Sequence, residues 1–110
     1  MTDTPLPKVF VFFAPTLFPL GQIVSTQGAL EACSEAHRLQ CLNRHARGDW
    51  GNVCGDDKAS NDQALIDGDR VLSAYPLDPT KPSKGYGANC LWIITEADRS
   101  VTTFLLPDEY

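Results

Sequence analysis

Apolar positions in the first half of the chain follow a helical spacing between residues 27 and 46. Leu39, Leu42 and Ala46 recur at steps of three and four, which places them on one face of a helix over residues 38–46. Thr26 is a suitable N-cap for a preceding helix over 27–36, which could run on into the second. Gly48 is placed to end this helical region.

The next helix is predicted between Asp56, as its N-cap, and Gly68, as the glycine after its last turn. Its sequence is strongly polar and offers only a few residues for burial, namely Ala59, Ala64, Leu65 and Ile66. We therefore expect a surface helix with one narrow contact to the rest of the protein.

Strand patterns dominate the remainder. Residues 70–75, 89–95 and 100–106 are rich in β-branched and aromatic side chains, and a proline-rich loop over 76–88 separates the first two. The segment 8–14, KVFVFFA, is also a predicted strand, but without alternation, so it is either buried on both faces or covers an apolar patch. Residues 22–25 form a short strand or an extended lead-in.

Helices grouped before three consecutive strands predict an α+β fold. We expect a small antiparallel sheet built from a C-terminal meander, which the N-terminal strand could join, with two or three helices packed on one face. At 110 residues the chain forms a single domain, 1–110, with a loose N-terminal arm over residues 1–7.

The overall charge narrows the class of partner. Fourteen acidic residues against nine basic ones give a net charge of −5, which opposes direct nucleic-acid binding. The same sign suits a protein that presents carboxylates to a basic surface on another protein.

The four cysteines do not indicate a secreted protein. The apolar run over residues 9–20 superficially resembles an export signal, but Pro15 and Pro19 interrupt it and no clear cleavage site follows. The run is too short to span a membrane. We therefore expect a cytoplasmic protein with no membrane association, reduced thiols and no structural disulfide.

One stretch, Arg44-His45-Ala46-Arg47-Gly48-Asp49-Trp50-Gly51, concentrates the candidate chemistry. Trp50 is expected to be buried and to anchor the turn against the sheet. His45 and Asp49 could form an acid–base pair, which Asp98 and Arg99 would join if the tip of the last hairpin, Glu96–Arg99, folds over the helix end. The purely structural alternative is that the basic side chains stabilise the helix C-terminus and that Asp49 closes the turn.

Two weaker chemical patterns accompany this stretch. Cys33, His37, Cys41 and His45 recur every four residues, but the first and last would lie about 18 Å apart on one helix, so only one adjacent pair with Cys54 could hold zinc. Buried apolar cysteines are the alternative. A hydroxyl nucleophile could come from Ser100, Thr102 or Thr103, although no GxSxG motif is present. No phosphate loop or dinucleotide motif occurs, and we expect no cofactor.

Aspartates gather on and around the third predicted helix. Together they could form a negative strip that imitates a row of phosphates and occupies a basic groove on another protein. The alternative is an ordinary solvated helix. The aspartates concerned are Asp56, Asp57, Asp62, Asp67 and Asp69.

The segments RHARGDWG, RVLSAY and LWIITEADRSVTTFLLPDEY, with the acidic helix between the first two, resemble a family of small uncharacterised bacterial proteins often labelled plasmid-related. The resemblance covers roughly residues 24–110. It implies a setting, namely the bacterial cytoplasm and the cargo of mobile genetic elements, and it carries no assigned activity.

These observations predict a non-enzymatic protein-binding module whose partner is a host protein. In the mobile-element setting, that partner could be a nucleic-acid-binding defence complex, and the protein its anti-CRISPR or anti-restriction inhibitor; this last step is an analogy. The predicted binding residues are Asp56, Asp57, Asp62, Arg44, Arg47, Trp50 and Arg99. The alternative is a small enzyme, such as a hydrolase, that uses the His45/Asp49 pair.

Overall fold

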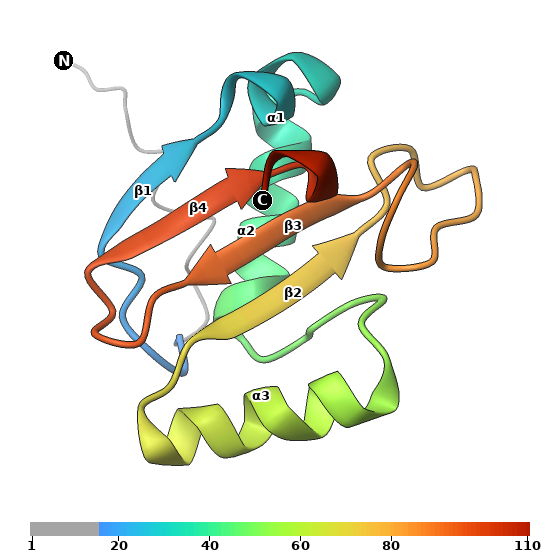
Figure 1. Ribbon diagram of the computed structural model, residues 1–110. Helices are drawn as coiled ribbons and strands as arrows, with labels where there is room; N and C mark the ends of the chain where they lie inside the picture. Colours follow the sequence, from blue (N-terminus) through green and yellow to red (C-terminus); the bar gives the residue numbers. More distant parts are fainter. Residues whose placement is uncertain (1–15) are drawn as a thin grey trace, which may run out of the picture.

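A computed structural model describes residues 16–110 (Figure 1). The predicted arm over 1–7 and the predicted strand over 8–14 lie outside these residues. In chain order, the elements are β1 (Gln22–Ser25), α1 (Gln27–Ala32), α2 (Glu35–Ala46), α3 (Gly55–Asp67), β2 (Val71–Tyr75), β3 (Leu91–Thr95), β4 (Val101–Leu105) and a short 3-10 helix (Pro107–Glu109).

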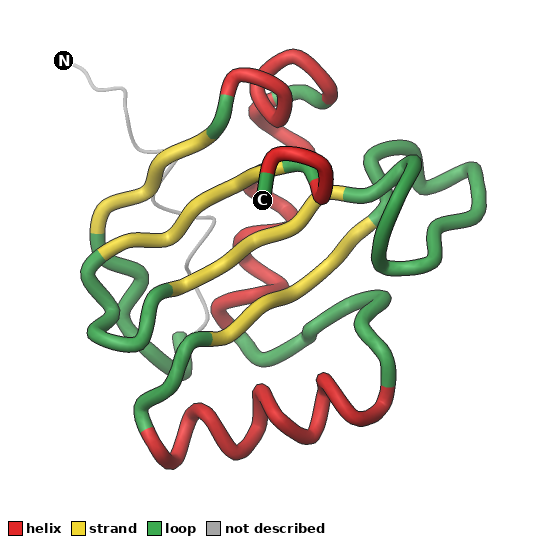
Figure 2. Tube along the Cα trace, viewed as in Figure 1, coloured by secondary structure: helices red, strands yellow, loops and turns green. Residues whose placement is uncertain are grey.

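The four strands form one sheet in the order β1-β4-β3-β2. The predicted meander of β2, β3 and β4 is antiparallel, as expected. The prediction of a purely antiparallel sheet is wrong, because β1 pairs with β4 in the parallel direction. Figure 2 shows the reason: the chain leaves β1 through the helices and returns to it only at the end, by a crossover instead of a tight turn. The α+β class is confirmed.

The helices do not all lie on one face. Helix α2 covers one face of the sheet, whereas α3 lies along the outer edge of β2 (Figure 1). Between α2 and the sheet, Leu42 of the helix belongs to a buried cluster with Tyr75, Leu91, Ile93 and Phe104 of the strands. Alternation along each strand puts these side chains on the covered face.

The first two helices are separate, and the predicted boundary between them is wrong. Thr26 caps α1 as expected, since its hydroxyl accepts a hydrogen bond from the Ala29 N–H. Helix α1 then stops at Cys33, because Ser34 caps a new helix by accepting from the His37 N–H. The Arg38 guanidinium secures the break by donating to carbonyl oxygens at the end of α1, those of Ala29, Leu30 and Cys33.

Helix α3 begins two residues earlier than its predicted cap, Asp56, would place its start. Its N-cap is Cys54, whose side chain makes no capping hydrogen bond, and Asp56 lies inside the first turn. In this first turn, the carboxylates of Asp56 and Asp57 interact favourably with the positive end of the helix dipole. Gly68 ends the helix in the left-handed conformation, as predicted.

Candidate functional site

The Arg44–Gly51 stretch forms the sharp turn between α2 and the sheet edge. Gly48 and Gly51 both have positive φ, 81° and 72°, which favours glycine at these positions. At Gly51 a side chain is also excluded by space, because a Cβ would lie 2.0 Å from the Ala74 carbonyl oxygen. The turn therefore brings the backbone of residues 50–52 directly against β2.

Arg44 and Asp49 form an ion pair within this turn. The guanidinium donates two hydrogen bonds to the carboxylate, at 2.7 and 3.2 Å. The same guanidinium lies over the ring of Tyr75, whose hydroxyl donates to the Asp49 carbonyl oxygen. Hydrogen bonding to Arg44 lowers the pKa of Asp49 below its usual value. Asp49 thus closes the turn and is not paired with His45, so the predicted acid–base pair is wrong.

His45 lies instead in a buried chain of hydroxyl groups. The Nδ1 atom is 2.5 Å from the Ser73 Oγ and the Nε2 atom is 2.8 Å from the Thr95 Oγ1. Thr95 Oγ1 is in turn 2.7 Å from Thr102 Oγ1, which donates to the Leu20 carbonyl oxygen. The imidazole is fully buried, so no substrate can reach it.

The end of this chain fixes the direction of every hydrogen bond in it. A carbonyl oxygen only accepts, so the Thr102 hydroxyl proton is committed to Leu20 and Thr102 must accept from Thr95. Thr95 then accepts from the Nε2–H of His45, and the Nδ1 atom accepts from Ser73. Burial, together with the charge of Arg99, lowers the pKa of His45 to about 3. His45 is therefore a neutral structural histidine at physiological pH.

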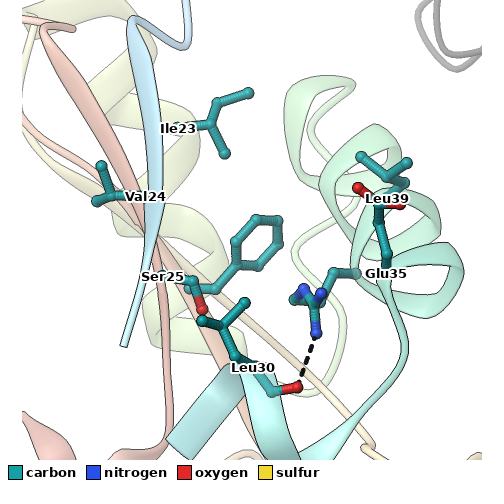
Figure 3. Close-up of a pocket in the computed structure, with 8 residues that line it drawn as sticks. Ile23, Val24, Ser25, Leu30, Glu35 and Leu39 are labelled. Carbon is teal, nitrogen blue, oxygen red and sulfur yellow. Dashed lines mark hydrogen bonds between the residues drawn. The ribbon is translucent and has the colours of Figure 1, made fainter. Parts of the chain in front are cut away.

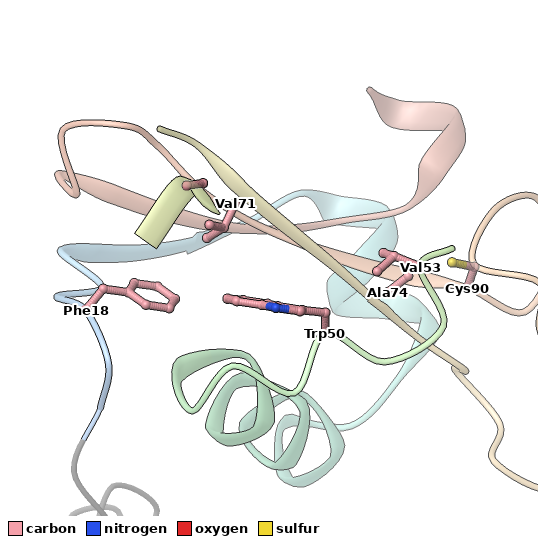
Figure 4. Packing of buried hydrophobic residues seen from close by; sticks show 7 residues of the cluster. Phe18, Trp50, Val53, Val71, Ala74 and Cys90 are labelled. Carbon is pink, nitrogen blue, oxygen red and sulfur yellow. The ribbon is translucent and has the colours of Figure 1, made fainter. Parts of the chain in front are cut away.

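Trp50 is buried, as predicted, with 4% of its surface exposed. Its ring stacks at 6.2 Å on Phe18 and meets the edge of His45 at 5.8 Å. Figure 4 shows Phe18 on one side of the indole and Val53 on the other. The indole N–H donates to the Asp62 carboxylate at 2.9 Å, which ties the turn to α3. Buried in this way, Trp50 cannot serve as the binding residue that the sequence indicated.

The hairpin tip lies near this cluster, but its predicted pairings are wrong. Asp98 accepts from the backbone and hydroxyl of Ser100 and reaches neither His45 nor Arg47. Arg99 donates to the carbonyl oxygens of Ala64 and Asp69 at the end of α3, not to Asp49. Its guanidinium also lies over the Phe18 ring, 5.3 Å from the centroid. The tip therefore closes the C-terminus of α3 and adds no polar site beside Asp49.

Of the predicted zinc ligands, only one adjacent pair is brought together, with His37 Nε2 3.6 Å from Cys41 Sγ. Cys33 ends α1, while the Nε2–H of His37 donates to the Pro76 carbonyl oxygen and His45 is held by hydroxyl groups. Burial raises the pKa of the Cys41 thiol to about 12, which disfavours the thiolate that a metal requires. Cys54 is exposed at the start of α3. Within residues 16–110, no group of three or more potential ligands could hold a metal ion.

The proposed hydroxyl nucleophiles are held in strand and turn positions. Thr102 is fully buried in the chain of hydroxyls, and Ser100 donates to Asp98 in the hairpin turn. Thr103 is half-buried on strand β4. These residues have the strand and turn roles that the alternative interpretation expected.

The aspartates of α3 do not form one continuous strip. Asp62 turns toward Trp50, and Asp57 lines a hollow with Asn61 and Leu72 on the side of the helix next to β2. Asp56 and Asp67 share the outer face, because the residues between them make about three helical turns. Arg47, a further predicted binding residue, is exposed at the end of α2.

Two polar arrangements were not predicted from the sequence. One is the Ser73–His45–Thr95–Thr102 chain, and the other is Asn61, whose side-chain amide both donates to the Leu72 carbonyl oxygen and accepts from the Leu72 N–H. Period-two alternation places Ser73 on the same strand face as Tyr75, and Thr95 on that of Ile93, which signals their burial. Nothing in the sequence pairs them with a histidine on a distant helix.

Comparison with protein-family models, with curated proteins and with solved structures gave no match. The described part of the chain contains no helix of the length and apolarity needed to cross a membrane.

Proposed function

We propose that this protein is a non-enzymatic protein-binding module and that the outer face of α3 is its contact surface. The main support is the state of the catalytic candidates: His45 is buried and neutral, Asp49 is bound to Arg44, and Asp98 is bound to Ser100. An acid–base enzyme needs a base that a substrate can reach and that is free to take a proton. His45 is out of reach, and the exposed carboxylates of Asp49 and Asp98 are already hydrogen-bonded.

The observation that carries the proposal is an exposed isoleucine on a charged helix. Ile66 has 78% of its surface exposed, more than any other large hydrophobic residue within 16–110. It lies on the side of α3 opposite the buried Asn61 and Ala64, next to Asp67. We define the α3 outer face as the exposed residues on this side: Asp56, Ala59, Gln63, Ile66 and Asp67. An apolar centre with acidic flanks fits a partner that is apolar and basic at the same place.

The rest of the molecule holds this face rigidly. Asn61 fixes the middle of α3 to the backbone of Leu72, and Asp62 binds the Trp50 indole. At the C-terminal end, Arg99 donates to the carbonyl oxygen of Ala64. A helix clamped at these points loses little conformational freedom on binding, which favours affinity.

The partner we propose is a host protein with a basic surface of the kind that binds nucleic acid. The net charge of −5 favours such a surface over nucleic acid itself. The resemblance to plasmid-related proteins points to a mobile-element protein in a bacterial cytoplasm. In that setting, a restriction or CRISPR complex is the partner class we propose.

Affinity capture from a bacterial lysate, with the tagged full chain as bait, tests this function. The informative variant is Asp67→Lys, because a cation in the last turn of a helix should stabilise it slightly, so lost capture would not reflect unfolding. Ile66→Ser probes the apolar centre, and Glu96→Lys is a control with the same charge change at the hairpin tip.

The expected result is a partner that is captured by the wild type and by Glu96→Lys but lost with both α3 variants. Equal capture by all four baits, or loss with Glu96→Lys alone, would contradict the assignment of the α3 outer face.

A further inference from the structure

Within residues 16–110, strand β1 leaves one edge of the sheet open. It is the last strand in the order β1-β4-β3-β2, and its neighbour β4 is bonded through the N–H groups of Gln22 and Thr26, which donate to Ser100 and Phe104. Alternation along the strand therefore points the backbone groups of Ile23 and Ser25 away from β4. The sequence of β1, QIVS, contains none of the charges or prolines that usually protect such an edge.

An apolar groove runs beside this edge. It lies between β1 and α2 and encloses about 650 Å³, its open side included; the apolar residues that line it are Ile23, Val24, Leu30, Leu39 and Phe104. Ile23 and Leu30 are 43% and 47% exposed. Figure 3 shows Ile23 and Leu39 pointing into the space between strand and helix, while Val24 points to the other side of β1.

The chain itself supplies a matching segment. Fifteen residues precede the described part, and seven of them, KVFVFFA over 8–14, contain three phenylalanines and two valines. Their non-alternating pattern predicts a strand that is either buried on both faces or covers an apolar patch. Seven extended residues span up to about 23 Å, more than the roughly 13 Å of a four-residue strand such as β1.

The connection to β1 also fits. Residues 15–21 join the two segments, and within them Phe18 is buried and the Leu17 N–H donates to the Ala46 carbonyl oxygen. This anchor lies at the end of the sheet where β1 begins. Phe18 lies under the guanidinium of Arg99 in the hairpin turn, and the Gln22 N–H donates to Ser100 in the same turn. A segment that ends at residue 14 therefore reaches the first residue of β1.

We propose that residues 8–14 add a fifth strand to the open edge, antiparallel to β1, and place phenylalanine side chains in the groove. The new strand would pair with the outward backbone groups of Ile23 and Ser25 and cover the apolar side chains of Ile23 and Leu30. This inference does not depend on the function proposed for α3.

Amide hydrogen exchange of the labelled full chain, followed by NMR, tests the proposal. The amides of Ile23 and Ser25 should be protected about 100-fold or more relative to an exposed amide. The variant Val11→Pro should abolish that protection, because proline cannot pair as a regular strand residue. Thr2→Pro is the control outside the segment and should leave it intact. The amides of Gln22 and Thr26, bonded to β4, report that the sheet remains folded in every variant.

Two outcomes would overturn the proposal. Unprotected Ile23 and Ser25 amides in the wild type would mean that the edge is open in solution. Protection that survives Val11→Pro but disappears on dilution would mean that the edge is covered by the β1 strand of a second copy.

Discussion

The two edges of the sheet are finished in different ways within residues 16–110. On the β2 side, the outward N–H and carbonyl groups of Leu72 and Ala74 are all hydrogen-bonded. The Asn61 side chain pairs with both groups of Leu72. The Ala74 N–H donates to the Trp50 carbonyl oxygen, and the Ala74 carbonyl oxygen accepts from the Asn52 N–H. On the β1 side, the corresponding groups of Ile23 and Ser25 face away from the sheet. One edge is closed by specific side chains and a tight turn, and the other borders an apolar groove.

The difference between the two edges indicates the structural role of the RHARGDWG stretch. The RHARGDWG stretch has the residue types of an active site, yet several of its residues serve to close a sheet edge. Gly51 allows the backbone to reach Ala74, Trp50 fills the space beneath, and Asp49 holds the turn through Arg44. The closed edge thereby becomes the platform that carries α3, and we place binding on that helix and not in the motif.

The largest effect is expected from removing the central side chain of the closed edge. Trp50→Ala should cost about 3–5 kcal/mol of unfolding free energy, because it empties a buried indole site and leaves the Asp62 carboxylate without its donor. Trp50→Phe, which keeps most of the packing and loses the hydrogen bond, should cost less. Denaturant unfolding of both variants measures this, and an unchanged midpoint for Trp50→Ala would contradict the account.

Acid should lower the free energy of unfolding through His45, which is hydrogen-bonded to Ser73 of β2. The folded-state pKa of about 3 lies below the unfolded value of 6.5, so this contribution to stability is complete above pH 6.5 and falls as the pH drops toward 3. From pH 7 to 4.5 the loss should be about 2–3 kcal/mol. A His45→Gln variant, which is neutral throughout, should lack this part of the slope. Identical slopes for wild type and variant would show that His45 is not held neutral.

A smaller effect is expected from removing the Asn61 side chain, whose hydrogen bonds join α3 to β2. Asn61→Ala should cost about 1–3 kcal/mol, because the N–H and carbonyl groups of Leu72 lose their partner. Gln63→Ala on the exposed side of the same helix should change stability by less than about 0.5 kcal/mol. Thermal unfolding of the pair would detect the contrast, and equal shifts would argue against the clamp.

The smallest effects on stability are expected when one valine near each edge is replaced by threonine. Val71→Thr on β2 places a hydroxyl in a fully buried site and should cost about 1–2 kcal/mol. Val24→Thr on β1, where the side chain lies on the side of the strand opposite Ile23 and is partly exposed, should stay within about 0.5 kcal/mol. Chemical denaturation of the two variants gives the ranking, and a larger cost at Val24 would reverse it.

Much of the fold could be predicted because it rests on local signals. The β-branched and aromatic residues of the C-terminal strands predicted the meander correctly. The cap at Thr26 and the glycine at Gly68 predicted two helix ends correctly. The parallel pairing of β1 could not be predicted, because strand direction depends on how the helices carry the chain across. Ser34 was missed as a cap because the neighbouring residues continue a helical pattern.

The candidate site was harder to predict because its side chains are shared between distant elements. Burial of Trp50 followed from its size and its flanking glycines. The partners of His45 lie 28 and 50 residues away, on β2 and β3, and no spacing in the sequence links them to α2. Arg99 was expected to pair with a carboxylate, but in the fold the carbonyl oxygens at the end of α3 lie closer to it.

We propose that the protein binds its partner through the α3 outer face. The most direct test of this proposal is the dissociation constant of the captured partner, purified and titrated against wild type, Asp67→Lys and Glu96→Lys at low and moderate salt. The account predicts that Asp67→Lys weakens binding about tenfold and reduces its salt dependence, whereas Glu96→Lys changes it less than about twofold. Equal dissociation constants for the two variants would contradict it.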